Sequence, residues 1–92
     1  MEPLTKEQKI FSLCQLLASL ENEADIAALF EDLCTRKELE NMAERLYAAK
    51  LLLEGNTYNQ VMALSDISSA TLSRVSRCVQ YGSGYAKLLK PE

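Results

Sequence analysis

Small and basic side chains gather near the end of the chain, between residues 68 and 80. In a helix, which turns 100° per residue, one face of this segment collects hydroxyl, methyl, guanidinium and amide groups. We call it the reader face: Ser69, Ala70, Ser73, Arg74, Arg77 and Gln80. Small residues allow close approach to a groove, hydroxyls reach bases or phosphates, and arginine binds guanine bidentately. This face therefore has the chemistry of a surface that contacts duplex DNA.

The expected contacts divide by side-chain type. We expect direct base contacts from Ser69, Ala70 and Ser73. Phosphate or base contacts near the groove are expected from the others: Ser68, Arg74 and Arg77. A plain solvated helix is the competing interpretation. Such a surface usually carries Glu, Lys and Gln, whereas no acidic residue occurs here between Asp66 and Glu92.

A short helix and a polar turn precede this segment. Thr57-Tyr-Asn-Gln60 has the form of a capping box, and it predicts a helix that ends near Leu64, with Val61 and Leu64 directed inward. Ser65-Asp66-Ile67 follows as the turn. Many such turns have glycine where Asp66 stands, so we expect a positive φ at Asp66.

The second helix of the pair has an apolar stripe opposite the reader face. Ser68 is suited to cap it, and Leu72, Val75 and Val79 lie within about 60° of one another. Residues 57–80 thus match the outline of a helix-turn-helix. Any two helices joined by a turn share such spacing, so the composition of the reader face carries the prediction.

The residues before and after this motif are also predicted to form helices. Thr5 is suited to be the N-cap of a helix to about Leu20, and Asn22 with nearby acids suits the start of a second helix. Thr35-Arg-Lys-Glu38 predicts the start of a third helix of roughly 19 residues, the longest, which Gly55 ends. A short helix is expected within 85–89. The predicted fold class is all-α, with about six helices.

We expect one domain over residues 1–92, acting as a homodimer. Its parts are a helical dimerisation core at 1–55, the helix-turn-helix at 57–80 and a short C-terminal helix at 81–92. Apolar residues make up 48% of this short chain, and a chain of this size buries only a modest core of its own. The first predicted helix is apolar on two sides, which indicates a second subunit as one of its partners.

Charge and composition narrow the function further. The formal net charge is −3, but residues 57–92 carry four basic groups against two acidic ones, a net of +2. The chain has no histidine, no recognisable nucleophile motif and no phosphate-binding glycine loop, so we expect neither an enzyme nor a cofactor. The three cysteines, Cys14, Cys34 and Cys78, are expected to be buried, reduced thiols. No apolar run approaches the ~20 residues of a membrane span, and a cytoplasmic location is expected.

With these residues in view, the chain resembles the Trp-repressor-like family, in particular its small YerC/YecD-type branch. The resemblance rests on 30–38, the run Ala43-Glu-Arg-Leu-Tyr-Ala-Ala-Lys-Leu-Leu-Leu-Glu-Gly55, Thr57-Tyr58, Ser69-Ala-Thr-Leu-Ser-Arg-Val75 and Tyr81-Gly-Ser-Gly-Tyr85. It implies an intertwined all-helical dimer whose two helix-turn-helix units enter adjacent major grooves.

The resemblance also implies a pocket for a small-molecule effector. Matching the motifs places Arg45 and Arg74 at two arginines that sandwich an amino-acid ligand, with Thr35 at a threonine of the pocket. Val75 stands where the Trp repressor has a glycine beside the ligand, so we expect free tryptophan not to control this protein. Arg45 has no acidic residue three or four positions away, and a solvated side chain is its other interpretation.

These observations predict a sequence-specific, dimeric, DNA-binding transcriptional regulator. The competing prediction is a helical protein-interaction module that has lost DNA binding. Salt-dependent binding to duplex DNA distinguishes the two.

Overall fold

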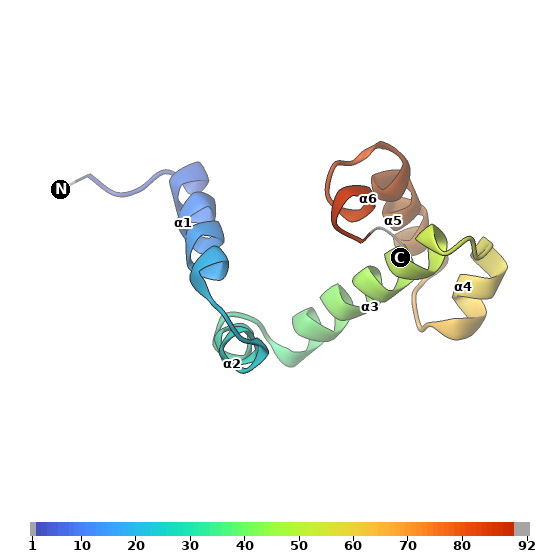
Figure 1. The fold of residues 1–92 in the computed structure, drawn as a ribbon, viewed down its shortest axis with the longest axis horizontal. Coiled ribbons are helices and arrows are strands. Elements are labelled where there is room, and N and C mark those ends of the chain that lie inside the picture. The colour runs from blue at the N-terminus through green and yellow to red at the C-terminus, as the bar shows by residue number, and fades with distance from the viewer. Residues whose placement is uncertain (1, 90–92) are drawn as a thin grey trace. The chain divides into compact units, whose positions relative to one another are not determined.

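The computed structural model describes residues 2–89, which form helices and no strand. The elements are α1 (Lys6–Ser19), α2 (Glu23–Leu33), α3 (Arg36–Leu53), α4 (Tyr58–Leu64), α5 (Ser69–Tyr81) and α6 (Tyr85–Leu88) (Figure 1). The all-α class and the six helices are as predicted, and α3 is the longest at 18 residues. Lys90 and Glu92, which contribute to the sequence charge, lie outside the described residues.

Helix starts are fixed by side-chain caps. The Thr5 hydroxyl accepts a hydrogen bond from the Gln8 amide at 3.1 Å, and the Gln8 side chain accepts one from the Thr5 amide at 2.8 Å. Asn22 caps α2 by accepting from the Asp25 amide at 2.9 Å. These bonds satisfy amides that have no partner within the helix. They confirm the first two predicted starts.

Gly55 ends α3 in the predicted way. Its φ is +96°, in the left-handed region, and its amide donates to the Leu52 carbonyl at 3.0 Å. The Asn56 amide donates to the Leu51 carbonyl at 3.1 Å, which completes a Schellman motif. The Asn56 side chain donates to the same carbonyl at 2.9 Å. This tight stop lets α4 begin within a few residues.

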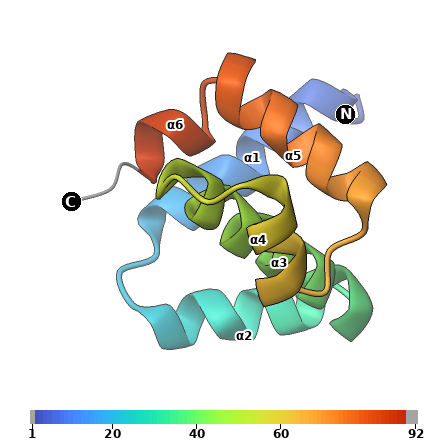
Figure 2. The ribbon, with the colours of Figure 1, turned by 90° about the vertical axis from the view of Figure 1, so that its right-hand side faces the viewer.

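The chain divides into two compact units, one up to Thr35 and one from Arg36 onward. In the second unit α3 contacts α4, α5 and α6, and α5 also contacts α6 (Figure 2). Its core is small and almost wholly aliphatic: Ala48, Ala49, Leu51, Val61, Ile67, Leu72 and Val75. The two alanines allow close packing on α3, and the helix-turn-helix is built directly on this core.

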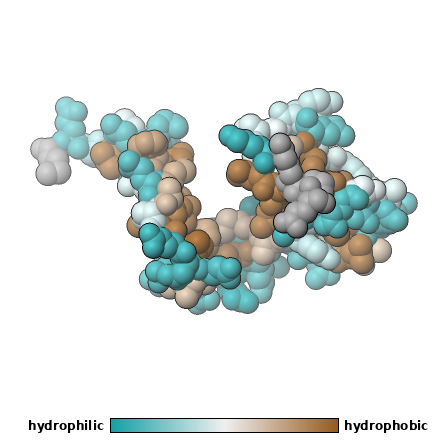
Figure 3. Space-filling model, in the orientation of Figure 1, coloured by the Kyte–Doolittle hydropathy of each residue, from teal (hydrophilic) through white to brown (hydrophobic). Residues whose placement is uncertain are grey.

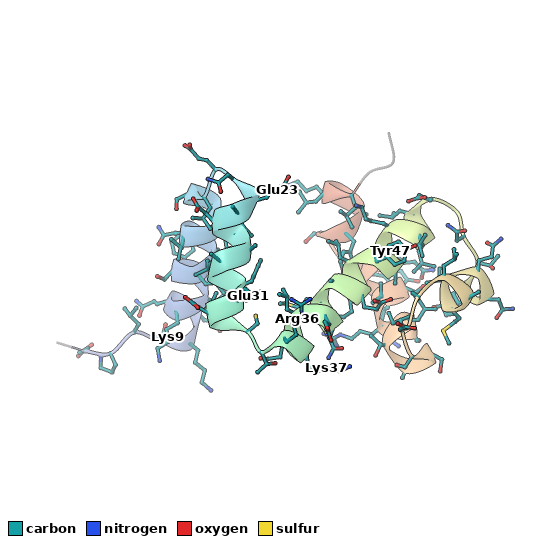
Figure 4. The ribbon with its side chains drawn as sticks, turned by 90° about the horizontal axis from the view of Figure 1, so that it is seen from below. Lys9, Glu23, Glu31, Arg36, Lys37 and Tyr47 are labelled. Atoms are coloured by element: carbon teal, nitrogen blue, oxygen red, sulfur yellow. The ribbon has the colours of Figure 1, made fainter. Side chains whose placement is uncertain are left out.

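The first unit contains α1 and α2, and neither helix has a buried residue. Ile10 and Phe11 are 56% and 64% exposed, and Leu33 is 52% exposed. Hydrophobic side chains appear on the surface of this unit in Figure 3. Charged groups such as Lys9 and Glu23 project from the same two helices (Figure 4). The apolar stripes expected from the sequence are therefore present, but in a single chain they are uncovered.

Two burial predictions are wrong for the single chain. Cys14 is exposed, and Cys34 and Cys78 are half-buried, although all three are free thiols. Cys14 lies on α1, whose apolar surface has no cover here. Leu64 is 55% exposed because it is the last residue of α4, where the chain already leaves the core for the turn.

Candidate nucleic-acid interface

The helix-turn-helix begins with a cap at Thr57. Its hydroxyl accepts from the Gln60 amide at 3.2 Å, and the Gln60 side chain accepts from the Thr57 amide at 2.7 Å, so the predicted capping box is present. One turn further, Val61 is fully buried in the core. The cap and this single anchor fix a helix of only seven residues. A helix this short depends on such contacts for its stability.

The turn between α4 and α5 needs no left-handed residue. Among the described residues other than glycine, none has a positive φ, so the expected positive φ at Asp66 is wrong. The chain turns instead through extended backbone at Ser65 and at Ser68. The Ser65 hydroxyl donates to the Val61 carbonyl at 2.7 Å, and Ile67 inserts into the core with 6% exposure.

A side chain from α3 also contacts this turn. Oε1 of Glu44 accepts a hydrogen bond from the Asp66 amide at 2.9 Å. Sequence reasoning missed this contact, although a signal was available. Glu44 shares a helical face with Ala48 and Leu51, both of which are buried, and an acidic group on the core side of a helix requires a polar partner.

Helix α5 presents its two faces as predicted. Leu72 is 0% exposed and Val75 is 1% exposed, both within the core, whereas Val79 is half-buried. Ser68 caps the helix: its hydroxyl accepts from the Thr71 amide at 3.2 Å and donates to the Thr71 hydroxyl at 3.0 Å. The six DNA-contact candidates are all exposed: Ser68, Ser69, Ala70, Ser73, Arg74 and Arg77. They share the exposed surface of one anchored helix and its cap, and their contacts with DNA stay predictions.

The electrostatic character of this surface follows from the sequence of α5 and α6. Their charged side chains are Arg74, Arg77 and Lys87, and neither helix contains an acidic residue. Because the first turn of α5 adds the positive end of the helix dipole, the N-terminal end of the reader face favours an anion. Phosphate oxygens are the anions that such a surface meets on duplex DNA.

Two of the three effector-pocket candidates lie together. Arg45 of α3 and Arg74 of α5 line one depression of about 300 Å³, together with Val75, Cys78 and Tyr85. Cys78 and Tyr85 were not among the predicted pocket residues. Thr35 belongs to the other compact unit, and its place in this pocket stays a prediction.

Val75 lines this depression, although only 1% of its surface is exposed and most of its side chain packs into the core. A second, apolar depression of about 460 Å³ shares Cys78 and Tyr85 with the first. It is lined by Leu46, Cys78, Gly82, Gly84, Tyr85, Leu88 and Leu89. An apolar hollow of this kind beside exposed Leu88 suits a protein surface better than a polar ligand.

Over residues 2–89, no cluster of cysteine, aspartate and glutamate side chains has the arrangement to hold a metal ion. Within the same residues, no helix has the length and apolarity that crossing a membrane requires.

Comparison with known proteins agrees with this geometry. The family model of the Trp repressor protein matches residues 8–91. The uncharacterized protein YerC of Bacillus subtilis strain 168 is 39% identical over 75 residues, which span 82% of this chain and 72% of YerC.

Two crystal structures have a similar fold. A Trp repressor candidate from Staphylococcus aureus is 33% identical, with a TM-score of 0.83 over 94% of this chain and 92% of that one. A TrpR-like protein from Eubacterium eligens ATCC 27750 is 36% identical, with a TM-score of 0.84 over 90% and 87% of the two chains.

Proposed function

This chain belongs to the Trp repressor family, and from that premise we propose that it is a sequence-specific DNA-binding regulator of transcription that acts as a homodimer. One observation carries the proposal. The reader face of α5 combines small residues with Arg74 and Arg77, is exposed, and sits on a helix whose other face is anchored by fully buried Leu72. A helix with that division of faces can enter a major groove while its domain stays folded.

The proposed contacts follow the chemistry of each side chain. Ser69, Ala70 and Ser73 are small and lie where base edges would be read. Arg74 and Arg77 supply positive charge to phosphates or bidentate bonds to guanine. Ser68 accepts from the Thr71 amide and donates its one hydroxyl proton to the Thr71 hydroxyl, so that proton would have to turn from Thr71 to a phosphate oxygen in the proposed contact.

The homodimer is supported by the exposed apolar surface of the single chain. Neither α1 nor α2 has a buried residue, and the surface of Phe11 is 64% exposed. Large apolar side chains in such positions are covered by a partner in stable proteins. A second copy of the chain brings a second α5, and two recognition helices read two half-sites about one helical turn apart.

An effector is a separate proposal. Arg45 and Arg74 face one depression, and guanidinium groups there would stack on a flat ligand or bind a carboxylate. We propose that free tryptophan does not act as this effector, and that DNA binding needs no ligand or responds to a different one.

A protein-interaction module without DNA binding is the alternative function. The exposed apolar surface of α1 and α2 fits an interaction module equally well. Such a module, however, gives no reason for the small and basic side chains of the reader face. Selection of bound sequences from a random duplex library distinguishes the two functions. The proposed function predicts enrichment of a site with two related halves centred about 10 base pairs apart. Recovery of an unenriched library would favour the interaction module.

A further inference from the structure

We propose that Glu44 is a positioning residue for DNA binding: its carboxylate holds the turn of the helix-turn-helix so that the N-terminal end of α5 is presented in one orientation. The inference rests on the proposed function and assigns to α3 a role in it. Glu44 itself makes no contact with DNA in this scheme. It acts through the backbone of Asp66.

The geometry that supports this role is a hydrogen bond across the second unit. Glu44 and Asp66 are 22 positions apart, and the distance from the Asp66 nitrogen to Oε1 of Glu44 is 2.9 Å. Glu44 is half-buried on α3, whereas Asp66 is exposed in the turn. An ionised carboxylate makes a stronger bond to an amide than a neutral acceptor does. The bond therefore ties an exposed, irregular segment to the longest helix of the chain.

The position of the bond explains what it would control. Asp66 is followed by Ile67, which is buried, and then by Ser68, which caps α5. Ile67 anchors the turn through its side chain, and Glu44 anchors it through the preceding amide. Two anchors on successive residues restrain both the place and the rotation of the turn. A turn that is already restrained in this way loses less conformational entropy when the reader face binds DNA.

The proposal can be tested because the negative charge of Glu44 and its hydrogen bond should affect DNA binding in opposite directions. Glu44 lines a depression of about 250 Å³ together with Ser68, Thr71 and Arg45, so its negative charge lies close to the start of the reader face. Through its field alone, an acidic group there repels phosphate and weakens DNA binding. Removing the charge should then tighten binding. Removing the hydrogen bond should weaken it, and the two effects can be separated.

Three substitutions separate them. Glu44→Gln keeps an acceptor at the same reach and removes the charge, Glu44→Asp keeps the charge and shortens the reach, and Glu44→Ala removes both. We expect the Gln variant to bind duplex DNA at least as tightly as the unmodified chain. The Asp variant, which loses the bond and keeps the charge, should bind about fivefold more weakly, and the Ala variant, which loses both, should bind more weakly than the Gln variant. Glu54→Ala is the control, because it removes an exposed acid from the C-terminal end of α3.

Amide hydrogen exchange without DNA supplies the second readout. The Asp66 amide should exchange fastest in the Ala and Asp variants and at an intermediate rate in the Gln variant, whose neutral acceptor makes a weaker bond, while the Leu72 amide stays unchanged in all three. DNA binding by Glu44→Ala that equals or exceeds that of Glu44→Gln would overturn the proposal, as would unaltered Asp66 exchange in the Ala and Asp variants. If the unmodified chain fails to bind duplex DNA, the proposed function falls and takes this role with it. If that chain binds and the variants do not differ, only the role of Glu44 falls.

Discussion

Ser73 and Arg77 lie on the same exposed face of α5, one turn apart, but they offer different things to a duplex. A serine hydroxyl forms directional bonds of modest strength, whereas arginine adds a full charge that acts on any sequence. Mutation of the two residues should therefore produce different kinds of defect.

The first prediction contrasts these residues. Arg77→Ala should weaken binding to every duplex and reduce the salt slope by about one per subunit, because one phosphate contact is lost. Ser73→Ala should change sequence preference more than overall affinity. Fluorescence anisotropy on one selected and one random duplex measures both effects. Lys50→Ala, which removes an exposed charge of α3 outside the reader face, is the matched control. If neither α5 variant differs from this control, the recognition surface lies elsewhere.

The second prediction concerns Val75 and the effector. A branched side chain beside Arg74 overpacks a site built for an aromatic amino acid, and overpacking typically costs about 1–3 kcal/mol. That cost reduces a micromolar affinity by roughly 5- to 150-fold. Calorimetric titration with tryptophan should therefore give no dissociation constant in the low micromolar range, and added tryptophan should leave DNA affinity unchanged. Tight binding with enhanced DNA affinity would mean that Val75 leaves the pocket open.

At the scale of the elements, the sequence predicted those features that depend on near neighbours. The capping box at Thr57, the cap at Ser68 and the positive φ of Gly55 each need only a residue type and a spacing of a few positions. The features that were missed depend on distant partners. Glu44 meets Asp66 from 22 positions away, and Tyr85 reaches the arginine-lined depression only because α6 docks on α3 and α5. The periodicity of one helix carries no information about contacts between residues that are distant in the sequence.

The third prediction tests how α5 is anchored. Leu72 is fully buried at the centre of its apolar stripe, so Leu72→Ala should lower the free energy of unfolding by ~2–5 kcal/mol. Leu64→Ala is a matched control, because Leu64 is 55% exposed and should contribute less than about 1 kcal/mol. Urea denaturation at one fixed protein concentration measures both values. Equal losses from the two leucines would show that the faces of the helix-turn-helix have been assigned wrongly.

At the scale of the whole molecule, the second unit has a core of its own and the first does not. Over residues 2–89, the buried hydrophobic residues all lie between Ala48 and Val75. The sequence showed that α1 and α2 are amphipathic, but it could not show what covers them, because the cover is not a near neighbour in the chain. A homodimer supplies that cover in our proposal, and it makes folding and association a single equilibrium.

The fourth prediction follows from this coupling. Sedimentation should show a dimer at micromolar concentration, built by residues 5–53. Phe11→Ser should shift it toward monomer, whereas Lys9→Ser, a change at an exposed charged position of the same helix, should not. A stable, fully folded monomer of the unmodified chain at that concentration would rule out the obligate dimer.

The central claim is that the reader face binds duplex DNA, and the dependence of affinity on salt tests it most directly. Arg74 and Arg77 from two subunits supply four positive charges, which predict a slope of log affinity against log salt of about −3 to −4. Affinity for a random duplex should then fall on the order of a hundredfold between about 50 and 200 mM salt. An affinity that is absent at low salt, or that does not change across this range, would contradict the account and favour a protein-interaction module.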